Sequence, residues 1–477
     1  MKINPKWNWL LENIHTFNGI TADSRAVHAN YIFVAGKGLA QDGRLFIQQA
    51  IERGASCIVA EDLFIEIENI HIVNVLDYRE ALSRLAAAFY KYPARNMRII
   101  GITGTCGKTT TTYLLEAILI ASGEKVGVIG SVNIRYPKMH EVANLTTPDP
   151  IYLHKILAQM LDAGCTYVIM EVSSHALEQK RVAGIDFTVA AFTNLSSEHL
   201  DYHGTMENYF AAKAQFFLNP RLYAVNNAVI NVSEPFGVQL LAKLQKASGT
   251  TRVITYNVNA IAHKTTLAGI EINIENTVLH THLMGIFNAY NVICAVKIAC
   301  VLGINITDIT KGLLELKGVP GRLERISTTS DFYVFVDFAH KPEALERVLQ
   351  SLQQIKKNAT ILLVFGCGGD RDKTKRPIMG RIASKYADYI WITSDNPRTE
   401  DPIKIIEEIK SGITNLSTVV LEPCREKAIK AALYQAKAGD IVLIAGKGHE
   451  TYQLIGSKKN PFDDRKIAQA ILKGLEV

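Results

Sequence analysis

A segment that combines two glycines, a lysine and several hydroxyl side chains could bind the phosphates of a nucleotide. It consists of Thr103, Gly104, Thr105, Cys106, Gly107, Lys108, Thr109 and Thr110. An apolar strand pattern ends at Ile102 and an apolar helical pattern follows the segment, which is the order of a phosphate-binding loop. In such a loop Lys108 neutralises phosphate charge, glycines let backbone N–H groups face the oxygens, and the hydroxyl of Thr109 suits Mg²⁺. Ile102 stands where the full motif has its first glycine, so an ordinary turn remains the alternative.

Polar side chains that follow two more apolar runs could hold a metal ion beside that loop. Glu171 follows the run at 167–170, and His199 lies in the polar segment after the run at 189–192. Open α/β sheets bind ligands at the carboxyl ends of their strands, so we expect these groups near the phosphate loop. Glu171 is the expected Mg²⁺ ligand and His199 the candidate for a second metal ion. For His199 or His203 taken alone, a surface or core-satisfied histidine is the alternative. Two cations would let a carboxylate attack a γ-phosphate by screening their repulsion.

Strand-length apolar runs alternate with helical patterns along the chain, which predicts an α/β protein. At 477 residues the chain is too long for one ordinary core, and we expect three domains. A proline interrupts the helical pattern near 91–94, and turn residues are frequent over 317–322. The predicted domains are therefore 1–96, a small α/β module; 97–321, a central P-loop domain with a mostly parallel sheet; and 322–477, a Rossmann-like, doubly wound domain.

The predicted strands lie in all three domains. They are 31–35 and 57–60 in the first domain, 97–102, 126–129, 167–170 and 189–192 in the second, and 332–336, 361–365, 389–393 and 441–445 in the third. The four runs of the third domain are apolar at nearly every position, as is typical of parallel strands that are buried on both faces.

The composition narrows the classes of protein that the chain could represent. The net charge of +6 is small and spread along the chain, so we expect no nucleic-acid partner, while a mildly cationic cleft would attract phosphates and carboxylates. Neither an export signal nor an apolar stretch of membrane-spanning length is present, so we expect a cytoplasmic protein that does not insert into membranes. The seven cysteines include no Cys-x-x-Cys pair, which argues against a disulfide framework or structural zinc.

Motifs spread over nearly the whole chain resemble those of the Mur ligases. Besides the phosphate loop they are Asp23-Ser24-Arg25, Asp42-Gly43-Arg44, Asn144-Leu145-Thr146-Thr147-Pro148, Glu171-Val172-Ser173-Ser174-His175, His199-Leu200-Asp201-Tyr202-His203-Gly204, Gly285-Ile286-Phe287-Asn288-Ala289-Tyr290-Asn291, Gly321-Arg322-Leu323-Glu324, Asp337-Phe338-Ala339-His340, Asp395-Asn396-Pro397-Arg398 and Gly446-Lys447-Gly448-His449-Glu450. The resemblance implies a cytoplasmic ATP-dependent ligase that adds meso-2,6-diaminopimelate to UDP-N-acetylmuramoyl-L-alanyl-D-glutamate through an acyl phosphate and a tetrahedral intermediate. It also implies Mg²⁺ as cofactor, ATP as co-substrate and a monomer. The first domain would then bind the uridine nucleotide, and the third the amino acid.

The resemblance also implies which residues contact each substrate. The uridine nucleotide and muramoyl dipeptide are assigned to Ser24, Thr146, Thr147, Ser173, Gln179 and Arg181. ATP is assigned to the phosphate loop and to Asn288, Asn291, Arg322, Asp337 and His340. The implied catalytic residues are Lys108, Glu171, His199 and Lys213, and the implied metal-binding residues are Thr109, Glu171, His199 and Lys213. Lys213 aligns with a lysine that the family carries as a carbamate, whose anionic oxygens can position Mg²⁺; an unmodified surface lysine is the alternative.

The third domain is expected to select the amino acid. The resemblance assigns diaminopimelate to Arg371, Asp395, Asn396, Pro397, Arg398, Gly446 and Glu450. Diaminopimelate differs from lysine by one extra carboxylate at its far end. The guanidinium of Arg398 can bind that carboxylate through two parallel hydrogen bonds and would repel the bare ammonium of lysine. A lysine-adding ligase, with Arg398 as a solvent-facing loop residue, is the alternative.

Two other functions would explain some of these sequence motifs. Folylpolyglutamate synthetase has the same loop and acyl-phosphate chemistry, but the first-domain motif around Ser24 disfavours it. A P-loop regulatory or nucleic-acid-binding ATPase would explain Lys108 and the positive charge, but leaves the third-domain motifs unexplained. Cys106, Phe338 and Lys341 depart from the family pattern and affect details of nucleotide contact.

Overall fold

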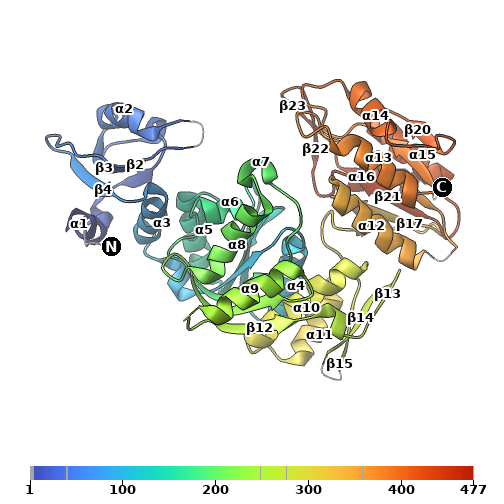
Figure 1. The fold of residues 1–477 in the computed structure, drawn as a ribbon, viewed down its shortest axis with the longest axis horizontal. Coiled ribbons are helices and arrows are strands. Elements are labelled where there is room, and N and C mark those ends of the chain that lie inside the picture. The colour runs from blue at the N-terminus through green and yellow to red at the C-terminus, as the bar shows by residue number, and fades with distance from the viewer. Residues whose placement is uncertain (1–4, 39–40, 248, 275–276, 357, 476–477) are drawn as a thin grey trace. The chain divides into compact units, whose positions relative to one another are not determined.

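The computed structural model describes residues 5–38, 41–247, 249–274, 277–356 and 358–475. Contacts divide the chain into two compact units, Met1–Asn259 with Asn291–Gly312 and Ala260–Tyr290 with Leu313–Val477. Each unit is described by itself, and Figure 1 colours the chain from blue at the N-terminus to red at the C-terminus. The domain boundaries proposed from the sequence remain predictions. The first residues of the first predicted domain and the last residues of the third lie outside the described residues.

The first sheet has four parallel strands in the order β1-β2-β3-β4. Its elements are α1 (Pro5–Glu12), β1 (Gly19–Thr21), β2 (Tyr31–Ala35), α2 (Ile47–Glu52), β3 (Ala55–Glu61), β4 (His71–Val75) and α3 (Tyr78–Phe89), with 3₁₀ turns η1 (Ile14–Thr16), η2 (Ser24–Ala26), η3 (Gly43–Phe46) and η4 (Pro93–Asn96). Side chains alternate along β2, so Ile32 packs with Leu10 of α1 and Leu85 of α3, whereas Phe33 packs with Ala50 of α2. Helices therefore cover both faces (Figure 1).

The central sheet has eight strands in the order β12-β11-β10-β5-β9-β6-β7-β8. They are β5 (Arg98–Thr103), β6 (Val126–Ile129), β7 (Asn133–Tyr136), β8 (Met139–Val142), β9 (Tyr167–Glu171), β10 (Asp186–Phe192), β11 (Ala224–Asn231) and β12 (Arg252–Tyr256). The strands from β12 to β6 are parallel, and β7 and β8 add an antiparallel ribbon. Because β5 lies between β10 and β9, the loops that follow these three strands meet at one edge. That edge carries the phosphate loop and Glu171.

Helices pack tightly around the central sheet. They are α4 (Lys108–Ala121), α5 (Pro150–Asp162), α6 (Ser174–Glu178), α7 (Leu200–His203), α8 (Met206–Leu218), α9 (Pro235–Lys246), α10 (Ile286–Val301) and α11 (Ile306–Glu315). Leu157 of α5 and Phe216 of α8 share one apolar cluster with Val168 and Phe187 of the sheet. This apolar cluster rigidly supports the strand ends that carry the candidate site.

One core side chain makes the stability of this unit sensitive to acid. His154 on α5 is buried, and neither ring nitrogen has a hydrogen-bond partner within the described residues. Burial lowers the pKa of His154 to about 4, from an ordinary value of 6.5. Between these two pH values the unfolded chain binds the extra proton, so stability is present above pH 6.5 and is lost as the pH falls toward 4.

We predict that His154→Leu removes this acid sensitivity. From pH 7.5 to 5.5 the wild type should lose about 1 kcal/mol through His154, which lowers its Tm by about 2–4 °C. The variant should not lose this part of its stability when the pH is lowered. Its Tm should be higher than that of the wild type even at pH 7.5, because the variant buries no unpaired imidazole. Calorimetry at both pH values measures the difference, with the exposed His140→Gln as the control. Equal Tm losses in wild type and His154→Leu would contradict the prediction.

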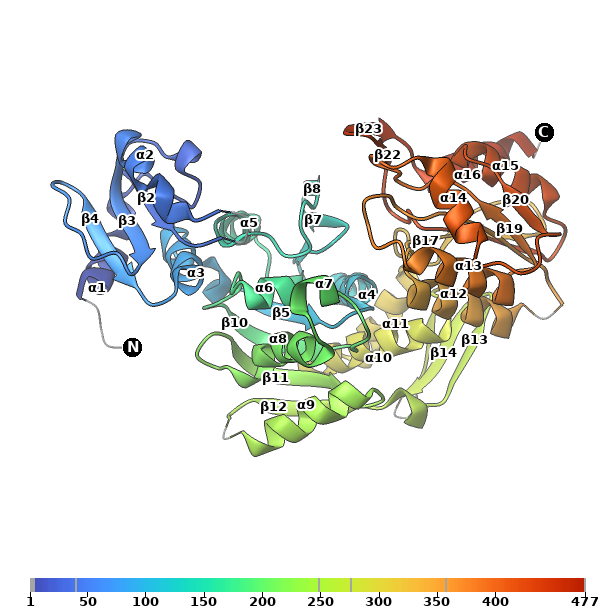
Figure 2. The ribbon, with the colours of Figure 1, turned by 45° about the horizontal axis from the view of Figure 1, so that its top comes forward.

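The second unit contains a six-stranded sheet in the order β16-β17-β21-β18-β19-β20, in which only β16 is antiparallel. Its elements are β16 (Glu324–Ile326), β17 (Tyr333–Asp337), α12 (Pro342–Ile355), β18 (Ile361–Phe365), α13 (Lys375–Tyr386), β19 (Tyr389–Ile392), α14 (Pro402–Lys410), β20 (Val419–Leu421), α15 (Arg425–Gln435), β21 (Ile441–Ala445) and α16 (Asp464–Leu475). Leu363 of β18 packs with Leu349 of α12 and Ile406 of α14, whereas its neighbour Val364 packs with Ile429 of α15. Helices on both faces (Figure 2) confirm the predicted doubly wound domain.

The predicted strands are all present, and 31–35, 126–129, 361–365 and 441–445 have the predicted bounds. Other strands of the structure were not predicted from the sequence, and they are short or carry polar residues. They are β1, β4, β11, β12, β16 and β20, the ribbon of β7 and β8, the antiparallel sheet of β13 (His263–Thr266), β14 (Gly269–Ile274) and β15 (Thr277–Thr281), and the hairpin of β22 (Tyr452–Ile455) and β23 (Lys458–Pro461). Within the described ranges, no helix has the length and apolar character needed to cross a membrane.

Candidate active site

The phosphate loop joins β5 to α4 and has a backbone that requires its glycines. Gly104 and Gly107 have φ angles of +144° and +87°, which L side chains rarely adopt. A Cβ on Gly104 would lie 1.9 Å from Oγ1 of Thr193, and a Cβ on Gly107 would lie 2.2 Å from Oδ1 of Asn291. The predicted order of strand, loop and helix is present, and Asn291 lies against the loop.

Two lysines donate to the same carbonyl group of the loop. Nζ of Lys108 donates to the carbonyl oxygens of Gly104 and Thr105, at 2.8 and 2.9 Å. Nζ of Lys213, from α8, donates to the carbonyl oxygen of Gly104 at 2.9 Å. Only 1% of Lys213 is exposed, and this burial, together with the charge of Lys108, lowers the pKa of Lys213 well below its ordinary value. The Lys213 side chain is therefore a candidate for a neutral amine beside the phosphate loop.

The buried carboxylate of Glu171 is held by donors from two other segments. Oγ1 of Thr109 and the backbone N–H of Ser131 donate to Oε1, at 2.9 and 3.0 Å, and the hydroxyl of Ser131 donates to Oε2 at 2.9 Å. A Cβ on Gly130 would lie 2.5 Å from Oε1, so the carboxylate also fills the space that this glycine leaves. Ser131 was not among the predicted site residues, although its place just after the predicted strand 126–129 was a usable signal.

The donors beside the phosphate loop fit a magnesium ion. Mg²⁺ prefers oxygen ligands and is commonly held by one or two carboxylates together with substrate phosphates. Glu171 and Thr109 supply a carboxylate and a hydroxyl in mutual contact. Within the part of the chain that the structure describes, no group of three His, Cys, Asp or Glu side chains is placed to hold a metal ion. Further ligands would come from water, from substrate phosphates or from single side chains such as His199.

Residues predicted for the muramoyl dipeptide gather beside Glu171. The hydroxyl of Thr147 donates to the backbone carbonyl of Glu171 at 2.8 Å, and Nη1 of Arg181 donates to the carbonyl of Thr147 at 2.7 Å. Arg181 also donates to Oε1 of Gln179, and the hydroxyls of Ser173 and Thr147 lie 3.4 Å apart. The structure thus joins these four predicted residues into one polar cluster.

The other two residues predicted for this substrate have separate surroundings. The hydroxyls of Thr146 and Ser131 lie 3.0 Å apart, so Thr146 contacts a residue that donates hydrogen bonds to the Glu171 carboxylate. Ser24 belongs to the first sheet region, where its hydroxyl donates to Oε1 of Gln49 at 2.7 Å. The neighbouring Asp23 caps η2, since its carboxylate accepts from the backbone N–H of Arg25, and this makes part of that motif structural.

The histidines after β9 and β10 form an aromatic group. The ring of His199 lies 4.8 Å from that of His175 and 6.2 Å from that of Tyr209, measured between centroids. His199 has a φ of +55°, an uncommon backbone conformation that often marks a functional position. The buried His203 has Nε2 3.0 Å from the hydroxyl of Ser174, so it agrees with the alternative of a satisfied core histidine. The metal-binding role of His199 remains a prediction.

In the second unit, three residues predicted for ATP gather around Phe338. The carboxylate of Asp337 accepts two backbone N–H groups, at 2.6 and 2.7 Å. The guanidinium of Arg322 lies 4.9 Å from the centroid of the Phe338 ring, and Nδ1 of His340 lies 2.8 Å from the Phe338 carbonyl oxygen. Nε of Arg322 is buried without a hydrogen-bond partner within the described residues, a donor that a ligand could satisfy. Asn288 is buried in the same unit, on α10.

Loops after β19 and β21 bring the predicted amino-acid residues together. Nδ2 of Asn396 donates to Oε2 of Glu450 at 2.9 Å. A Cβ on Gly446 would lie 2.7 Å from Oδ2 of Asp395, so the glycine permits the close approach of the two loops. Lys447 lies within one of the sequence motifs and was not predicted to have a role, yet its Nζ lies 3.1 Å from both Asn396 and Glu450.

Arg398 is held in place at both its backbone and its side chain. Its N–H donates to the carbonyl of Leu454 and its carbonyl accepts from Gly456, so it lies against the hairpin β22-β23. Its φ of +53° is strained for a residue other than glycine, and Nη1 donates to the carbonyl of Gly369 at 2.6 Å. Arg371 is exposed and donates to the carbonyl of Asp370, so the structure does not bring it into the Asn396 cluster through a hydrogen bond between described residues.

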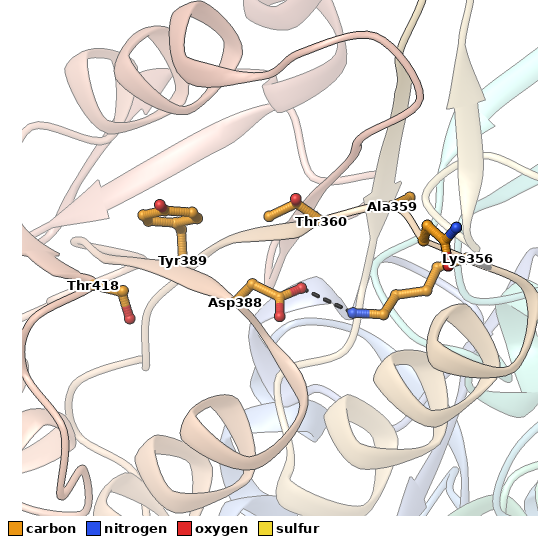
Figure 3. Close-up of a pocket in the computed structure, with 7 residues that line it drawn as sticks. Lys356, Ala359, Thr360, Asp388, Tyr389 and Thr418 are labelled. Atoms are coloured by element: carbon orange, nitrogen blue, oxygen red, sulfur yellow. Dashed lines mark hydrogen bonds and ion pairs between the residues drawn. The ribbon is translucent and has the colours of Figure 1, made fainter.

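A pocket of about 440 Å³ lies at the amino end of the same sheet, directly before β18, β19 and β20 (Figure 3). Its lining consists of Lys356, Asn358, Ala359, Thr360, Asp388, Tyr389 and Thr418. The charges in the pocket already pair with each other, since Nζ of Lys356 lies 3.0 Å from Oδ2 of Asp388. None of the predicted site residues lines it, because those follow the carboxyl ends of the strands.

Cys106 offers a chemical test of the phosphate loop. It is exposed, and its carbonyl accepts from the hydroxyl of Thr193 and from Nδ2 of Asn194. We predict that a maleimide on Cys106 abolishes nucleotide binding, because the adduct would occupy the space beside Lys108. ATP at ten times its dissociation constant should slow the modification by about tenfold.

Peptide mass spectrometry locates the adduct, and binding of a fluorescent ATP analogue measures its effect. Cys106→Ser is the matched control, since the exposed Cys300 and Cys424 remain available for labelling. This variant should keep nucleotide binding after maleimide treatment. Labelling of Cys106 that leaves nucleotide binding intact would show that the loop does not hold the phosphates.

The phosphate loop, the Glu171–Thr109 pair and a separate doubly wound domain are compatible with an ATP-dependent ligase. Comparison with protein families agrees with this class. Residues 16–90 match the Mur ligase family catalytic domain, residues 102–299 the Mur ligase middle domain, and residues 321–448 the Mur ligase glutamate ligase domain. The chain therefore belongs to the Mur ligase family.

Several proteins and one solved structure of similar sequence share a single name within the Mur ligase family. The UDP-N-acetylmuramoyl-L-alanyl-D-glutamate--2,6-diaminopimelate ligase of Fusobacterium nucleatum is 42% identical over 463 residues, covering 95% of this chain and 93% of that protein. The protein of the same name from Aquifex aeolicus is 42% identical over 464 residues, covering 96% and 94%. A solved structure of that name has a TM-score of 0.72 at 32% identity and covers 97% of this chain and 96% of that chain.

More distant structures share the fold. The MurF ligase of Thermotoga maritima, solved in complex with ADP, has a TM-score of 0.60 at 19% identity and covers 99% of this chain and 100% of that chain. The Mycobacterium tuberculosis folylpolyglutamate synthase, complexed with ADP and AMPPCP, has a TM-score of 0.60 at 19% identity and covers 77% of this chain and 92% of that chain.

Proposed function

We propose that the chain joins meso-2,6-diaminopimelate to the D-glutamyl carboxylate of UDP-N-acetylmuramoyl-L-alanyl-D-glutamate, in the synthesis of peptidoglycan precursors. The observation that carries this proposal is the loop cluster at the carboxyl edge of the second unit's sheet, where Arg398 and Glu450 offer opposite charges held by neighbouring loops. The far end of diaminopimelate bears a carboxylate and an ammonium. Opposite charges on neighbouring loops suit both groups, whereas lysine has no distal carboxylate for Arg398 to bind.

The proposed reaction consumes one ATP. A glutamyl carboxylate oxygen attacks the γ-phosphorus, the bond to the bridging oxygen breaks, and ADP leaves. The diaminopimelate amine then attacks the acyl carbon, loses a proton, and the tetrahedral intermediate collapses to the amide with loss of inorganic phosphate. Lys108 would stabilise the charge on the phosphoryl oxygens, and the polar cluster of Thr147, Ser173, Gln179 and Arg181 would orient the attacking carboxylate.

Magnesium is proposed as the cofactor, with Glu171 and Thr109 as ligands because their oxygens already contact each other beside the loop. Bound there, Mg²⁺ would reduce the repulsion between the carboxylate and the γ-phosphate. His199 and Lys213 stay proposed ligands. For Lys213 we propose carbamylation, since a buried amine with a lowered pKa can attack CO₂ and release one proton to leave an anionic carbamate.

The remaining assignments follow from the same proposal. Ser24 would contact the uridine nucleotide and Thr146 the muramoyl dipeptide. The ATP would be contacted by Asn288, Asn291, Arg322, Asp337 and His340. We further propose that the enzyme acts in the cytoplasm as a monomer, without a nucleic-acid partner. The modest net charge of +6, spread along the chain, supports the last point.

The test is phosphate release by the wild type from ATP and the muramoyl dipeptide nucleotide, with either meso-diaminopimelate or lysine. Turnover with diaminopimelate alone is the expected result. Equal turnover with lysine would keep the ligase and reject the specificity. Phosphate release with a folate substrate in place of the muramoyl nucleotide would favour folylpolyglutamate synthetase chemistry. Phosphate release that depends on DNA or RNA and falls steeply with salt would favour the P-loop regulatory ATPase.

A further inference from the structure

A fully buried lysine lies among the residues proposed to hold the amino acid. Lys447 follows β21, and its exposed fraction is 0%. Its Nζ donates to Oδ1 of Asn396 and to Oε2 of Glu450, both at 3.1 Å, and lies 3.8 Å from Oδ1 of Asp395. An ammonium without such partners would be expensive to bury, so its position requires these oxygens.

The charges around Lys447 do not cancel. One ammonium faces two carboxylates, those of Asp395 and Glu450. The buried guanidinium of Arg425 is paired with Asp464, at 2.8 and 2.7 Å, and interacts with Asp395 and Glu450 only through longer-range attraction. Among these five side chains, three carboxylates face two cations, and the excess negative charge suits an incoming ammonium group.

Lys447 also determines how Glu450 and Asn396 are oriented. Oε2 of Glu450 accepts from both Lys447 and Asn396, so the other oxygen, Oε1, is the one available to a ligand among the described contacts. Oδ1 of Asn396 accepts from Lys447 and from the backbone N–H of Leu454, which leaves its amide nitrogen to donate to Glu450. Glu450 is held by two of these hydrogen bonds and Asn396 by three, and Lys447 contributes one to each side chain.

We propose that Lys447 is a positioning residue, which holds Glu450 and Asn396 so that Glu450 binds the distal ammonium of diaminopimelate. This inference rests on the proposed function. Lys447 itself does not touch the amino acid, because its ammonium would repel that of the ligand. It acts through Glu450, and its removal should weaken amino-acid binding without changing the use of the other two substrates.

The test compares Lys447→Met with the wild type. Methionine keeps the length and apolar stem of lysine but removes the charge and the donors. We expect the KM for meso-diaminopimelate to rise about 30-fold, the scale of breaking a buried hydrogen-bonded charge pair. The KM values for ATP and for the muramoyl nucleotide should stay within about twofold of the wild-type values, because the variant does not change the contacts that bind those two substrates.

Lys356→Met is the matched control. Lys356 forms an ion pair with Asp388 at the amino end of the same sheet (Figure 3), so this variant also removes a paired lysine from the unit. It should leave all three KM values unchanged. If Lys447→Met raises the KM for ATP as much as that for diaminopimelate, Lys447 supports the whole unit and the proposal fails.

A double variant separates positioning from a general effect. If Lys447 acts through Glu450, Lys447→Met combined with Glu450→Gln should be no worse than Glu450→Gln alone. Additive losses would overturn the proposal. Should Lys447→Met not fold, Lys447→Gln keeps a donor for Asn396, and the same KM comparison applies. Failure of the proposed function is a distinct result, because the wild type itself would then not turn over diaminopimelate.

Discussion

Lys213→Ala is expected to lower the rate of phosphate release by about 100- to 1,000-fold at saturating substrates. Lys213 is buried beside Lys108, and these surroundings lower the pKa of its amine well below the ordinary value. A neutral amine can form a carbamate with CO₂, and that carbamate would supply an anionic oxygen near Gly104 of the phosphate loop. Alanine removes this group, so the charge on the transferring phosphoryl group would be stabilised less. Phosphate release with and without bicarbonate is the measurement.

Three comparisons distinguish a carbamate from a purely structural lysine. Lys213→Arg keeps a cation that cannot be carbamylated and should be as inactive as Lys213→Ala. Formate or acetate should partly restore the alanine variant, whose cavity can admit a small carboxylate, but should not restore the arginine variant. The wild type should lose activity in CO₂-depleted buffer and regain it with bicarbonate. Substantial activity in Lys213→Arg would indicate that Lys213 only supports the Gly104 carbonyl.

Arg398→Ala is expected to lower kcat/KM for meso-diaminopimelate by about 100-fold, while the much lower value for lysine changes little. Nη1 of Arg398 already donates to Gly369, and its backbone is held by the β22-β23 hairpin. A guanidinium held in this way loses little conformational freedom when it binds a carboxylate. Alanine leaves the distal carboxylate without its partner, but lysine has no such carboxylate to lose. Initial rates with each acid, measured at several concentrations, provide both constants.

The competing explanation is that Arg398 only shapes its loop, since its left-handed backbone and its bond to Gly369 could serve that purpose. In that case Arg398→Ala would lower kcat/KM equally for both acids. Arg398→Lys is a second test, because it keeps the charge without the planar fork and should have an intermediate kcat/KM for diaminopimelate. The exposed Arg381→Ala on α13 is the control and should leave both acids unaffected.

The predicted fold followed from local signals that tertiary contacts did not override. Runs such as 361–365 and 441–445 are apolar in every position and became strands buried on both faces. The strands that were missed, among them β7, β8, β11 and β13 to β15, are short or carry polar residues at several positions. Their stability depends on pairing with a neighbouring strand, which no local pattern records.

The candidate site was only partly accessible from sequence. Strand order brought Glu171, Thr109 and Ser131 into one cluster from three separate segments, and Ser131 carries no motif of its own. Lys447 was visible in a motif, but its role depends on contacts with Asn396, about fifty residues earlier in the chain. Side-chain direction decides such roles, and a sequence pattern specifies residue type and spacing only.

Sequence alone determined the phosphate loop, the alternation of strands and helices and the family, because each is encoded in residues that are close together in the chain. Only the tertiary structure decided that Lys213 is buried beside Gly104, that His203 is a hydrogen-bonded core residue, and that Lys447 pairs with Glu450. Burial and ion pairing arise from contacts between distant segments, and these contacts set the charge state on which the chemistry depends.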